Sequence, residues 1–180
     1  MSQEFQELVD AHYQPLYRFA YSLAKNPDRA ADLVQQTFCI WAQKGHQLKD
    51  RSKAKTWLFT TLYREQIGHA RRSNKFPEQD IDEVYDLSTD EQHASRGIDA
   101  KRAVELLKSL DETYRAPLTL FFMQQHSYKE IAAIIDIPMG TVMSRIARGK
   151  NLLKKLIAEP ESSDKKIVSI ETKMRQGTNG

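Results

Sequence analysis

Apolar residues recur every three or four positions along most of the chain, and few segments alternate with a period of two. This spacing places the apolar side chains on one face of a helix, so the pattern predicts an all-α fold. In the first half of the chain we expect three helices, at about residues 4–24, 29–43 and 53–72. Pro15 interrupts the apolar face of the first helix, and we expect it to kink or divide that helix.

The helical spacing returns after residue 100, where we expect four further helices, at about 102–110, 113–124, 128–135 and 139–158. Ser127 and Glu130 have the S-x-x-E form of a capping box, in which a hydroxyl and a carboxylate satisfy free amides reciprocally. Asp136 and Pro138 then predict a tight turn, because Asp tolerates a left-handed backbone better than most residues.

Charge divides the chain into blocks. Residues 77–99 carry eight acidic side chains and one basic one, whereas residues 1–76 and 100–158 each carry an excess of basic side chains. Basic blocks favour a polyanionic partner, and an acidic strip disfavours it. We therefore predict two small helical domains, 1–76 and 100–159, which are joined by a flexible acidic linker and followed by a disordered tail at 160–180.

Composition excludes several classes of protein. Cys39 is the only cysteine of the 180 residues, so neither an intrachain disulfide nor a metal site built on paired cysteines is expected. Its apolar neighbours predict that it is buried. We find no Gly-rich phosphate loop, metal-ligand spacing or nucleophile motif, so we expect neither an enzyme nor a cofactor. The sequence starts without a signal peptide and has no long apolar run, which predicts a cytoplasmic protein that does not enter a membrane.

The most specific pattern lies in residues 127–150, where two helices are joined by a short turn. This organisation is typical of a helix-turn-helix unit, and the small residue Ala132 stands where the second helix must pack closely on the first. The second helix offers hydroxyls and cations that can reach phosphates and base edges of duplex DNA. A plain helical hairpin with a solvated basic face is the alternative interpretation. The candidate contacts are Thr141, Ser144, Arg145, Arg148 and Lys150.

The same stretch resembles region 4 of the extracytoplasmic-function (ECF) sigma factors, whose pattern is close to Y-x-E-I-A-x-I-L-G-I-P-x-G-T-V-K-S-R. Two positions depart from that pattern: Asp136 stands where Gly is usual, and Met143 stands where Lys or Arg is usual. The resemblance implies that the second helix reads the −35 promoter element. The matching residues are Tyr128, Glu130, Ile131, Ala132, Ile137, Pro138, Gly140, Thr141, Val142, Ser144 and Arg145.

Residues 28–38 resemble the stretch of region 2 that docks on the clamp helices of the polymerase β′ subunit, often E-D-A-E-D-L-V-Q-E-x-F. The docking residues that this implies are Asp28, Asp32, Leu33, Gln35, Gln36 and Phe38. The chain has fewer acids here than the family pattern, which lowers charge complementarity with a basic partner. Phosphorylation of Thr56, Thr60 or Thr61 is one hypothesis for restoring that charge.

Residues 53–72 resemble the region 2 helix that opens the −10 element together with the loop before it. Cations can follow the phosphates there, while aromatic and polar groups receive an unstacked base. The implied contacts are Lys53, Lys55, Tyr63, Arg64, Arg71 and Arg72, and the loop 46–52 is the implied base pocket. Trp57 is expected to belong to the core.

The resemblance covers residues 5–76 and 100–158 and implies an alternative sigma factor. Such a protein binds core RNA polymerase through the β′ clamp helices and the β flap, and it directs initiation at promoters with −35 and −10 elements. An anti-sigma factor is a further partner that the family implies. A stand-alone helix-turn-helix regulator is the alternative, but it leaves the basic, aromatic segment 53–72 without a role.

Overall fold

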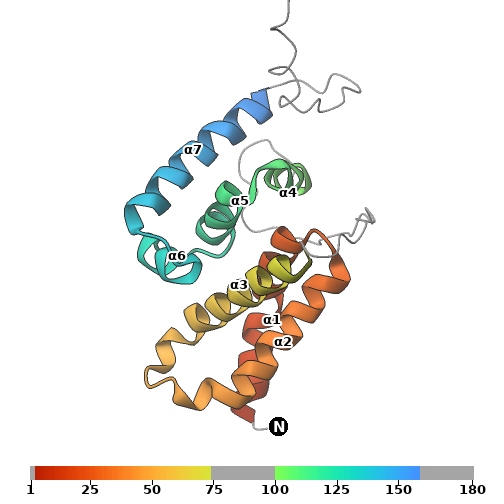
Figure 1. Ribbon diagram of the computed structural model, residues 1–180, viewed down its shortest axis with the longest axis vertical. Coiled ribbons are helices and arrows are strands. Elements are labelled where there is room, and N and C mark those ends of the chain that lie inside the picture. The colour runs from red at the N-terminus through yellow and green to blue at the C-terminus, as the bar shows by residue number, and fades with distance from the viewer. Residues whose placement is uncertain (1–2, 74–99, 159–180) are drawn as a thin grey trace, which may run out of the picture.

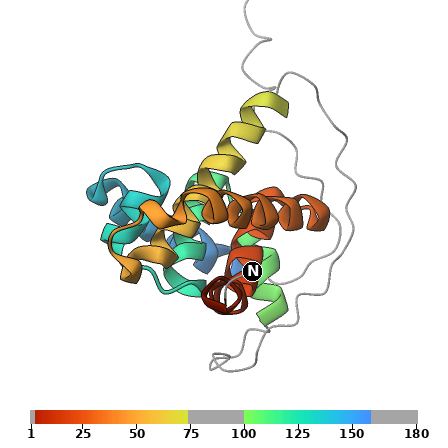
Figure 2. The ribbon, with the colours of Figure 1, turned by 90° about the horizontal axis from the view of Figure 1, so that it is seen from below.

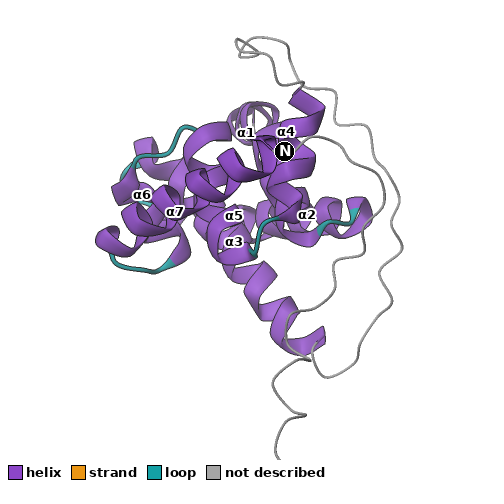
Figure 3. Cartoon of the chain, turned by 90° about the horizontal axis from the view of Figure 1, so that it is seen from above, coloured by secondary structure: helices purple, strands orange, loops and turns teal. Residues whose placement is uncertain are grey.

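The computed structural model describes residues 3–73 and 100–158, and both parts consist of helices joined by short turns (Figures 1 and 3). No strand occurs within these ranges, which confirms the all-α prediction. Residues 3–73 are called the first domain below, and residues 100–158 the second. The predicted linker 77–99 and tail 160–180 lie outside the described residues.

The first domain contains α1 (Gln3–Ala24), α2 (Pro27–Lys44) and α3 (Ala54–Ser73), with short 3-10 turns at Gly45–Gln47 and Arg51–Lys53. Helix α1 runs on through Pro15, so the expected division at this proline is wrong. Leu16 and Phe19, which follow the proline, are buried in the core and hold the helix in one piece.

Helix α2 begins at a proline, which suits the first helical position because the missing amide hydrogen is not needed there. Asn26 caps this helix, since its Oδ1 accepts a hydrogen bond of 2.9 Å from the Arg29 amide. Asp28 lies in the first turn of this helix. At the other end Gly45 leaves room for Trp41, because a Cβ atom at residue 45 would lie 2.6 Å from the indole ring.

The core of the first domain is built from all three helices. The rings of Phe19 and Phe59 lie 5.5 Å apart between centroids. Burial of apolar surface supplies the main favourable term that fixes α3 on α1 and α2. The central side chains are at most 2% exposed: Leu16, Phe19 and Ala20 of α1, Leu33 and Val34 of α2, and Leu58, Phe59 and Leu62 of α3.

The second domain contains α4 (Ala100–Ser109), α5 (Glu112–Leu118), a π-helical turn η3 (Thr119–Met123), α6 (Tyr128–Ile135) and α7 (Met139–Ala158). The single helix predicted at 113–124 is wrong, because η3 widens its second half. The widening follows Pro117, which has no amide hydrogen for a regular helical bond. The Gln124 amide donates to the Thr119 carbonyl, five residues back.

Local signals around α6 and α7 were predicted well. The capping box is present: the Ser127 amide donates to Glu130 Oε2 at 2.8 Å, and the Glu130 amide donates to Ser127 Oγ at 3.2 Å. Asp136 has a left-handed backbone, with φ of 55° and ψ of 53°. Helix α7 has the predicted bounds and buries Val142, Ile146 and Gly149 against its neighbours.

The two domains pack against each other. Helices α5 and η3 lie against α1, and α6 lies against α3, so one buried cluster extends through both domains (Figures 1 and 2). The C-terminal turns of α3, yellow in Figure 2, project from the packed helices. The N-terminal half of α3 is therefore covered by the second domain, and its C-terminal half is not.

Candidate nucleic-acid interface

Helix α7 presents one open face. Three of the five predicted −35 contacts, Ser144, Arg148 and Lys150, are exposed, and the Lys150 ammonium lies 5.9 Å from the centroid of the Phe122 ring. Thr141 and Arg145 are half-buried at the flanks. A stripe of exposed residues follows the first four turns of the helix, and Lys150 and Leu152 are also exposed beside it. The stripe is made of Met139, Gly140, Met143, Ser144, Ala147, Arg148 and Asn151.

Gly149 sets the depth at which α7 packs. A Cβ atom at this position would lie 2.6 Å from Leu118 Cδ1 of α5, so the two helices approach too closely for any larger residue without a shift. We expected Ala132 to provide the close contact for this helix, and it is only half-buried. A glycine inside a long predicted helix was the signal that could have identified the contact.

The predicted −10 contacts on and before α3 have very different environments. Lys53, Arg64 and Arg71 are exposed. Lys55 is half-buried, and its ammonium donates a hydrogen bond of 2.7 Å to the Gln124 carbonyl of the second domain. Arg72 belongs to α3, but its side chain lies outside the described part of the structure.

Tyr63 is half-buried, and its ring lies 6.5 Å from that of Phe19. Burial raises the pKa of its hydroxyl above the ordinary value, and the Glu112 carboxylate adds to this shift while the Arg145 guanidinium opposes it. Tyr63 is a predicted −10 contact and Arg145 a predicted −35 contact. These two residues of different domains therefore lie within electrostatic reach of each other.

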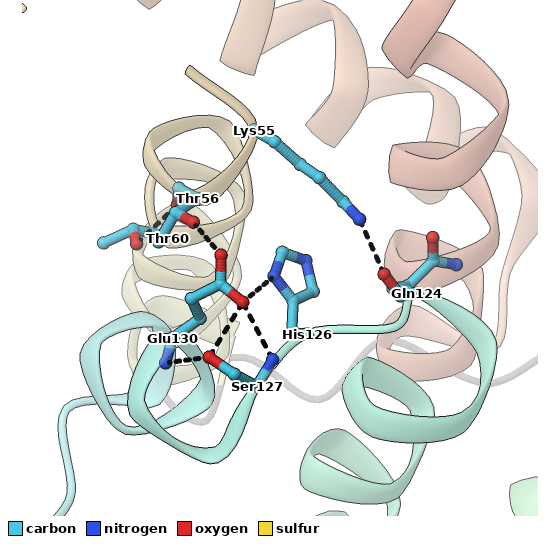
Figure 4. Close-up of polar contacts among 7 residues, drawn as sticks. All are labelled: Lys55, Thr56, Thr60, Gln124, His126, Ser127 and Glu130. Carbon is cyan, nitrogen blue, oxygen red and sulfur yellow. Dashed lines mark hydrogen bonds and ion pairs between the residues drawn. The ribbon is translucent and has the colours of Figure 1, made fainter. Parts of the chain in front are cut away.

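A group of polar and aromatic residues joins α3 to the start of α6, and we call it the interdomain cluster: Lys55, Thr56, Phe59, Gln124, His126 and Glu130. Figure 4 shows all of these residues except Phe59. The Thr56 hydroxyl donates to Glu130 Oε1 at 3.2 Å, so the capping carboxylate of α6 also binds α3. The Thr60 hydroxyl donates to the Thr56 carbonyl at 2.7 Å within α3. Phosphorylation of these threonines stays a prediction.

His126 is the buried centre of this cluster. It is 2% exposed, and its ring meets Phe59 edge to face with 4.7 Å between centroids. Its Nδ1 lies 3.9 Å from Glu130 Oε2, and neither ring nitrogen has a hydrogen-bond partner among the described residues. Burial, helped by the nearby Lys55 ammonium and opposed by Glu130, lowers the pKa of His126 to about 4.

The predicted docking residues of α2 divide into two groups. Asp28, Asp32, Gln35 and Gln36 are exposed on one face of the helix. Leu33 and Phe38 are 2% and 7% exposed, which corrects their assignment to the docking surface. Their side chains point into the core of the domain, so they hold α2 in place and cannot touch a partner in this conformation.

Two further expectations concern single residues of the first domain. Cys39 is exposed, so the prediction that it is buried is wrong: it follows Gln35 by one helical turn and shares its outward face. Trp57 is half-buried at the edge of the core, and its ring meets Trp41 edge to face at 5.0 Å.

The segment 46–52, the implied base pocket, is mostly exposed. Asp50 Oδ1 accepts hydrogen bonds from the Ser52 hydroxyl at 2.6 Å and from the Ser52 amide at 3.1 Å, and these bonds lower the pKa of its carboxyl. The Arg51 guanidinium lies 5.7 Å from the centroid of the Trp41 ring. The segment thus has a defined backbone, and its polar groups remain open to solvent.

Other kinds of site find no support in the described ranges. No group of three His, Cys, Asp or Glu side chains lies together as metal ligands would. None of the described helices combines the length and the apolar character that crossing a bilayer requires.

Comparison with known families explains the arrangement of both domains. Residues 8–76 match the family model for Sigma-70 region 2, and residues 100–153 match that for Sigma-70, region 4. The chain is 32% identical over 164 residues to the ECF RNA polymerase sigma factor SigE of Mycolicibacterium smegmatis, covering 87% of this chain and 62% of that protein. It is 30% identical over 143 residues to the ECF RNA polymerase sigma factor EcfG of Rhodopseudomonas palustris, covering 79% and 78%.

Among solved structures, the chain resembles the sigma factor RpoE of Bartonella quintana in complex with the anti-sigma factor NepR. The TM-score is 0.69 at 27% identity, over 87% of this chain and 98% of that one. The fold, the two matched regions and the relatives therefore agree, and the chain belongs to the ECF group of the sigma-70 family of RNA polymerase sigma factors.

Proposed function

We propose that this sigma factor divides its work among three surfaces: α2 binds core RNA polymerase, α3 with the segment before it opens the −10 element, and α7 reads the −35 element. The observation that carries this division is the combination of an open basic face on α7 with exposed cations on and before α3 in one chain. A stand-alone helix-turn-helix regulator would use α7 and leave the residues that match region 2 without a task.

The exposed face of α2 suits a protein partner better than DNA. Asp28 and Asp32 are its charged groups, and Gln35 and Gln36 continue the same face. Carboxylates repel phosphates and attract a basic protein surface such as the β′ clamp helices. With few charges present, polar and packing contacts must supply much of the affinity.

The exposed part of the −10 surface consists of Lys53, Arg64, Arg71 and the segment 46–52. Lys55 and Tyr63 belong to the same surface and are half-buried. Cations at this spacing can follow the phosphates of a single strand. Trp41, which is buried beneath Arg51, and the half-buried Trp57 lie beside this segment with their rings edge to face. An unstacked base held between the segment and the exposed edge of Trp57 is the arrangement that we propose for the open promoter.

The −35 surface is the exposed stripe of α7, in which the N-terminal turns of the recognition helix meet base edges. Ser144 and Arg148 are its central polar groups, and Lys150 lies beside them. The second domain also carries the proposed contact with the β flap. Since the relatives act together with RNA polymerase, we place the protein in the cytoplasm.

The test is a pull-down of core RNA polymerase followed by run-off transcription from a promoter library. We expect stable docking and transcripts from a small set of promoters. Arg148→Ala should weaken transcription from these promoters while it keeps docking, and Asp32→Lys should weaken docking. Sequence-specific binding of duplex DNA without any docking would favour the stand-alone regulator instead.

A further inference from the structure

The two proposed DNA-binding surfaces of this sigma factor, on α3 and on α7, are not equally exposed to solvent. The second domain covers the N-terminal half of α3, where it engages Lys55 through the Gln124 carbonyl and Thr56 through Glu130. On the opposite side of the contact, the Lys108 ammonium of α4 lies 4.7 Å from the centroid of the Tyr21 ring of α1 and 3.2 Å from its hydroxyl. These contacts form only while the two domains are packed against each other.

The chemistry of this contact suits a reversible association. The ring pair of Phe59 and His126 buries apolar surface, which favours closure. The two nitrogens of His126 lose water without gaining a hydrogen bond in the described structure, which disfavours closure. The favourable ring contact and the unfavourable desolvation of the ring nitrogens therefore offset each other at His126. The net free energy of the contact is then small, and such a contact can open.

We propose that the packing of the second domain on α3 is a closed, autoinhibited form of this sigma factor, and that single-stranded −10 DNA can occupy α3 only after residues 124–130 leave it. The proposal rests on the proposed role of α3. In the closed form the Gln124 carbonyl binds the Lys55 ammonium and Glu130 binds the Thr56 hydroxyl, so residues 124–130 cover the side of α3 that would meet the strand.

The test uses a variant that opens the contact from the side of the second domain. His126→Asp places a carboxylate against Phe59 and Glu130, where it is unfavourable in the closed form and solvated in the open form. Gln125→Asp is the matched control, because residue 125 is an exposed neighbour and receives the same charge. Thr56→Glu is a second opening variant: its carboxylate faces Glu130, and an acidic residue is favourable in the first turn of α3.

Two readouts follow in the full chain. The first is the distance between spin labels on Cys39 of α2 and on Lys154→Cys of α7, both at exposed positions. The second is the affinity for a pool of short single-stranded DNA of random sequence. We expect a narrow distance distribution in the wild type and the control, a broad one in both opening variants, and an affinity gain of about fivefold or more in the open forms.

A broad distance distribution in the wild type would overturn the proposal, and so would opening without a gain in single-strand affinity. If His126→Asp lowers the melting temperature of the second domain, Thr56→Glu decides the question. Run-off transcription with core polymerase is measured in parallel: if no variant supports it, the sigma-factor roles proposed above fail, whereas the distance and affinity results still decide whether the chain closes.

A second observation concerns what α7 can read. Singly exposed apolar side chains are ordinary on a protein surface, whereas neighbouring ones that form a patch mark a candidate contact site. Met139 and Met143 are 51% and 48% exposed, one turn apart, at the start of the recognition helix. Gly140 lies between them, and a Cβ atom added there would meet no other atom within 4 Å, so this part of the helix can approach a groove closely.

We infer that Met143, supported by Met139, selects thymine by contact with its C5 methyl group, which is the apolar feature of the major groove. The inference rests on the proposed −35 role of α7. Arg148 and Lys150 beside the two methionines supply the phosphate attraction that brings this apolar patch against the duplex.

The test compares two random duplex pools that differ only in this methyl group, one made with thymine and one with uracil. The full-length wild type should bind the thymine pool about threefold or more tightly, an effect in the range of one lost apolar base contact. Met143→Ala should remove that preference, and Ile157→Ala, at an exposed apolar position at the far end of α7, should keep it. The bound duplexes of each pool are also sequenced. If particular sequences are enriched but the thymine pool is not preferred, only this inference fails. If no sequence is enriched in either pool, the proposed −35 role of α7 fails as well.

Discussion

Helices α3 and α7 are both expected to touch promoter DNA, and both carry cations, but their surroundings differ. The N-terminal half of α3 lies under the second domain, with Lys55 bound to a carbonyl and Tyr63 half-buried. Ser144 and Arg148 of α7 face solvent. The comparison teaches that the residue types that suit a DNA contact are readable in a sequence, whereas their availability depends on how two domains pack.

The largest expected effect is the loss of stability on replacing Phe59, whose ring packs α3 against both domains. Phe59→Ala removes the contacts with Phe19 in the first domain and with His126 in the second. We expect a loss of about 3–5 kcal/mol in the free energy of unfolding, measured in urea, as for other buried Phe residues. Tyr13→Ala, at a position that is 38% exposed, should cost less than about 1 kcal/mol. A similar loss for both variants would contradict the role of Phe59.

The next prediction distinguishes the DNA that each helix binds, which is duplex DNA for α7 and single-stranded DNA for α3. Arg148→Ala should weaken binding of a −35 duplex by about 1–3 kcal/mol and reduce its salt dependence, because an exposed cation near the phosphates is lost. Arg64→Ala should spare the duplex and weaken single-stranded −10 DNA instead. Fluorescence anisotropy at several salt concentrations measures both. Equal effects of the two changes on both substrates would break the division of labour between α3 and α7.

Acid should shift the balance between packed and separated domains. His126 has a pKa of about 4 when buried and an ordinary value of 6.5 when exposed, so its neutral form stabilises the packed state. This contribution is complete above pH 6.5 and is lost as the pH falls from 6.5 to 4. Between about pH 7.5 and 5.5 the ratio of open to closed chains should therefore rise about tenfold.

The charged and titratable neighbours of His126 are Lys55 and Glu130, and His12 lies near Lys55 with a lowered pKa caused first by burial. His126→Phe keeps the ring contact with Phe59 and cannot titrate, so it should remove most of the pH dependence of the spin-label distances. His12→Gln should leave most of it in place. The opposite result would assign the acid response to His12.

The smallest expected effect tests the start of α6. Ser127→Ala removes the hydroxyl that accepts from the Glu130 amide, which should cost about 1 kcal/mol of stability. Because Glu130 keeps its bond with Thr56, we expect the domains to remain packed. Thermal unfolding and the spin-label distance measure the two consequences separately, and a broadened distance distribution would show that the cap and the interdomain contact are coupled.

Features fixed by neighbours in the sequence were predicted correctly. Ser127 and Glu130 form their box, Asp136 adopts the left-handed turn, and α7 has its expected bounds. Each of these depends on backbone groups within a few residues, where residue type decides the outcome. The positions of Ser144 and Arg148 on an exposed helical face also follow from periodicity alone.

Features fixed by distant contacts were missed. Leu33 and Phe38 match a docking pattern, yet their side chains complete a core that involves all three helices of the first domain. Cys39 has apolar neighbours in sequence and an exposed position in space. The bond between Lys55 and Gln124 joins residues 69 positions apart, and no local pattern of residue types encodes such a pair.

The π-helical turn at Thr119–Met123 has a consequence for how this family member could change. A π turn holds one more residue than the α-helical turn it replaces, and each residue of an α-helix adds about 100° of rotation. Loss of a single residue from this segment would therefore restore an α-helical turn with nearly the same rotation, and Gln124 and His126 would keep their direction toward α3. We therefore expect the contact between the two domains to tolerate a one-residue deletion within Thr119–Met123, whereas a one-residue deletion in the regular helix α5 would rotate Gln124 and His126 by about 100° away from α3.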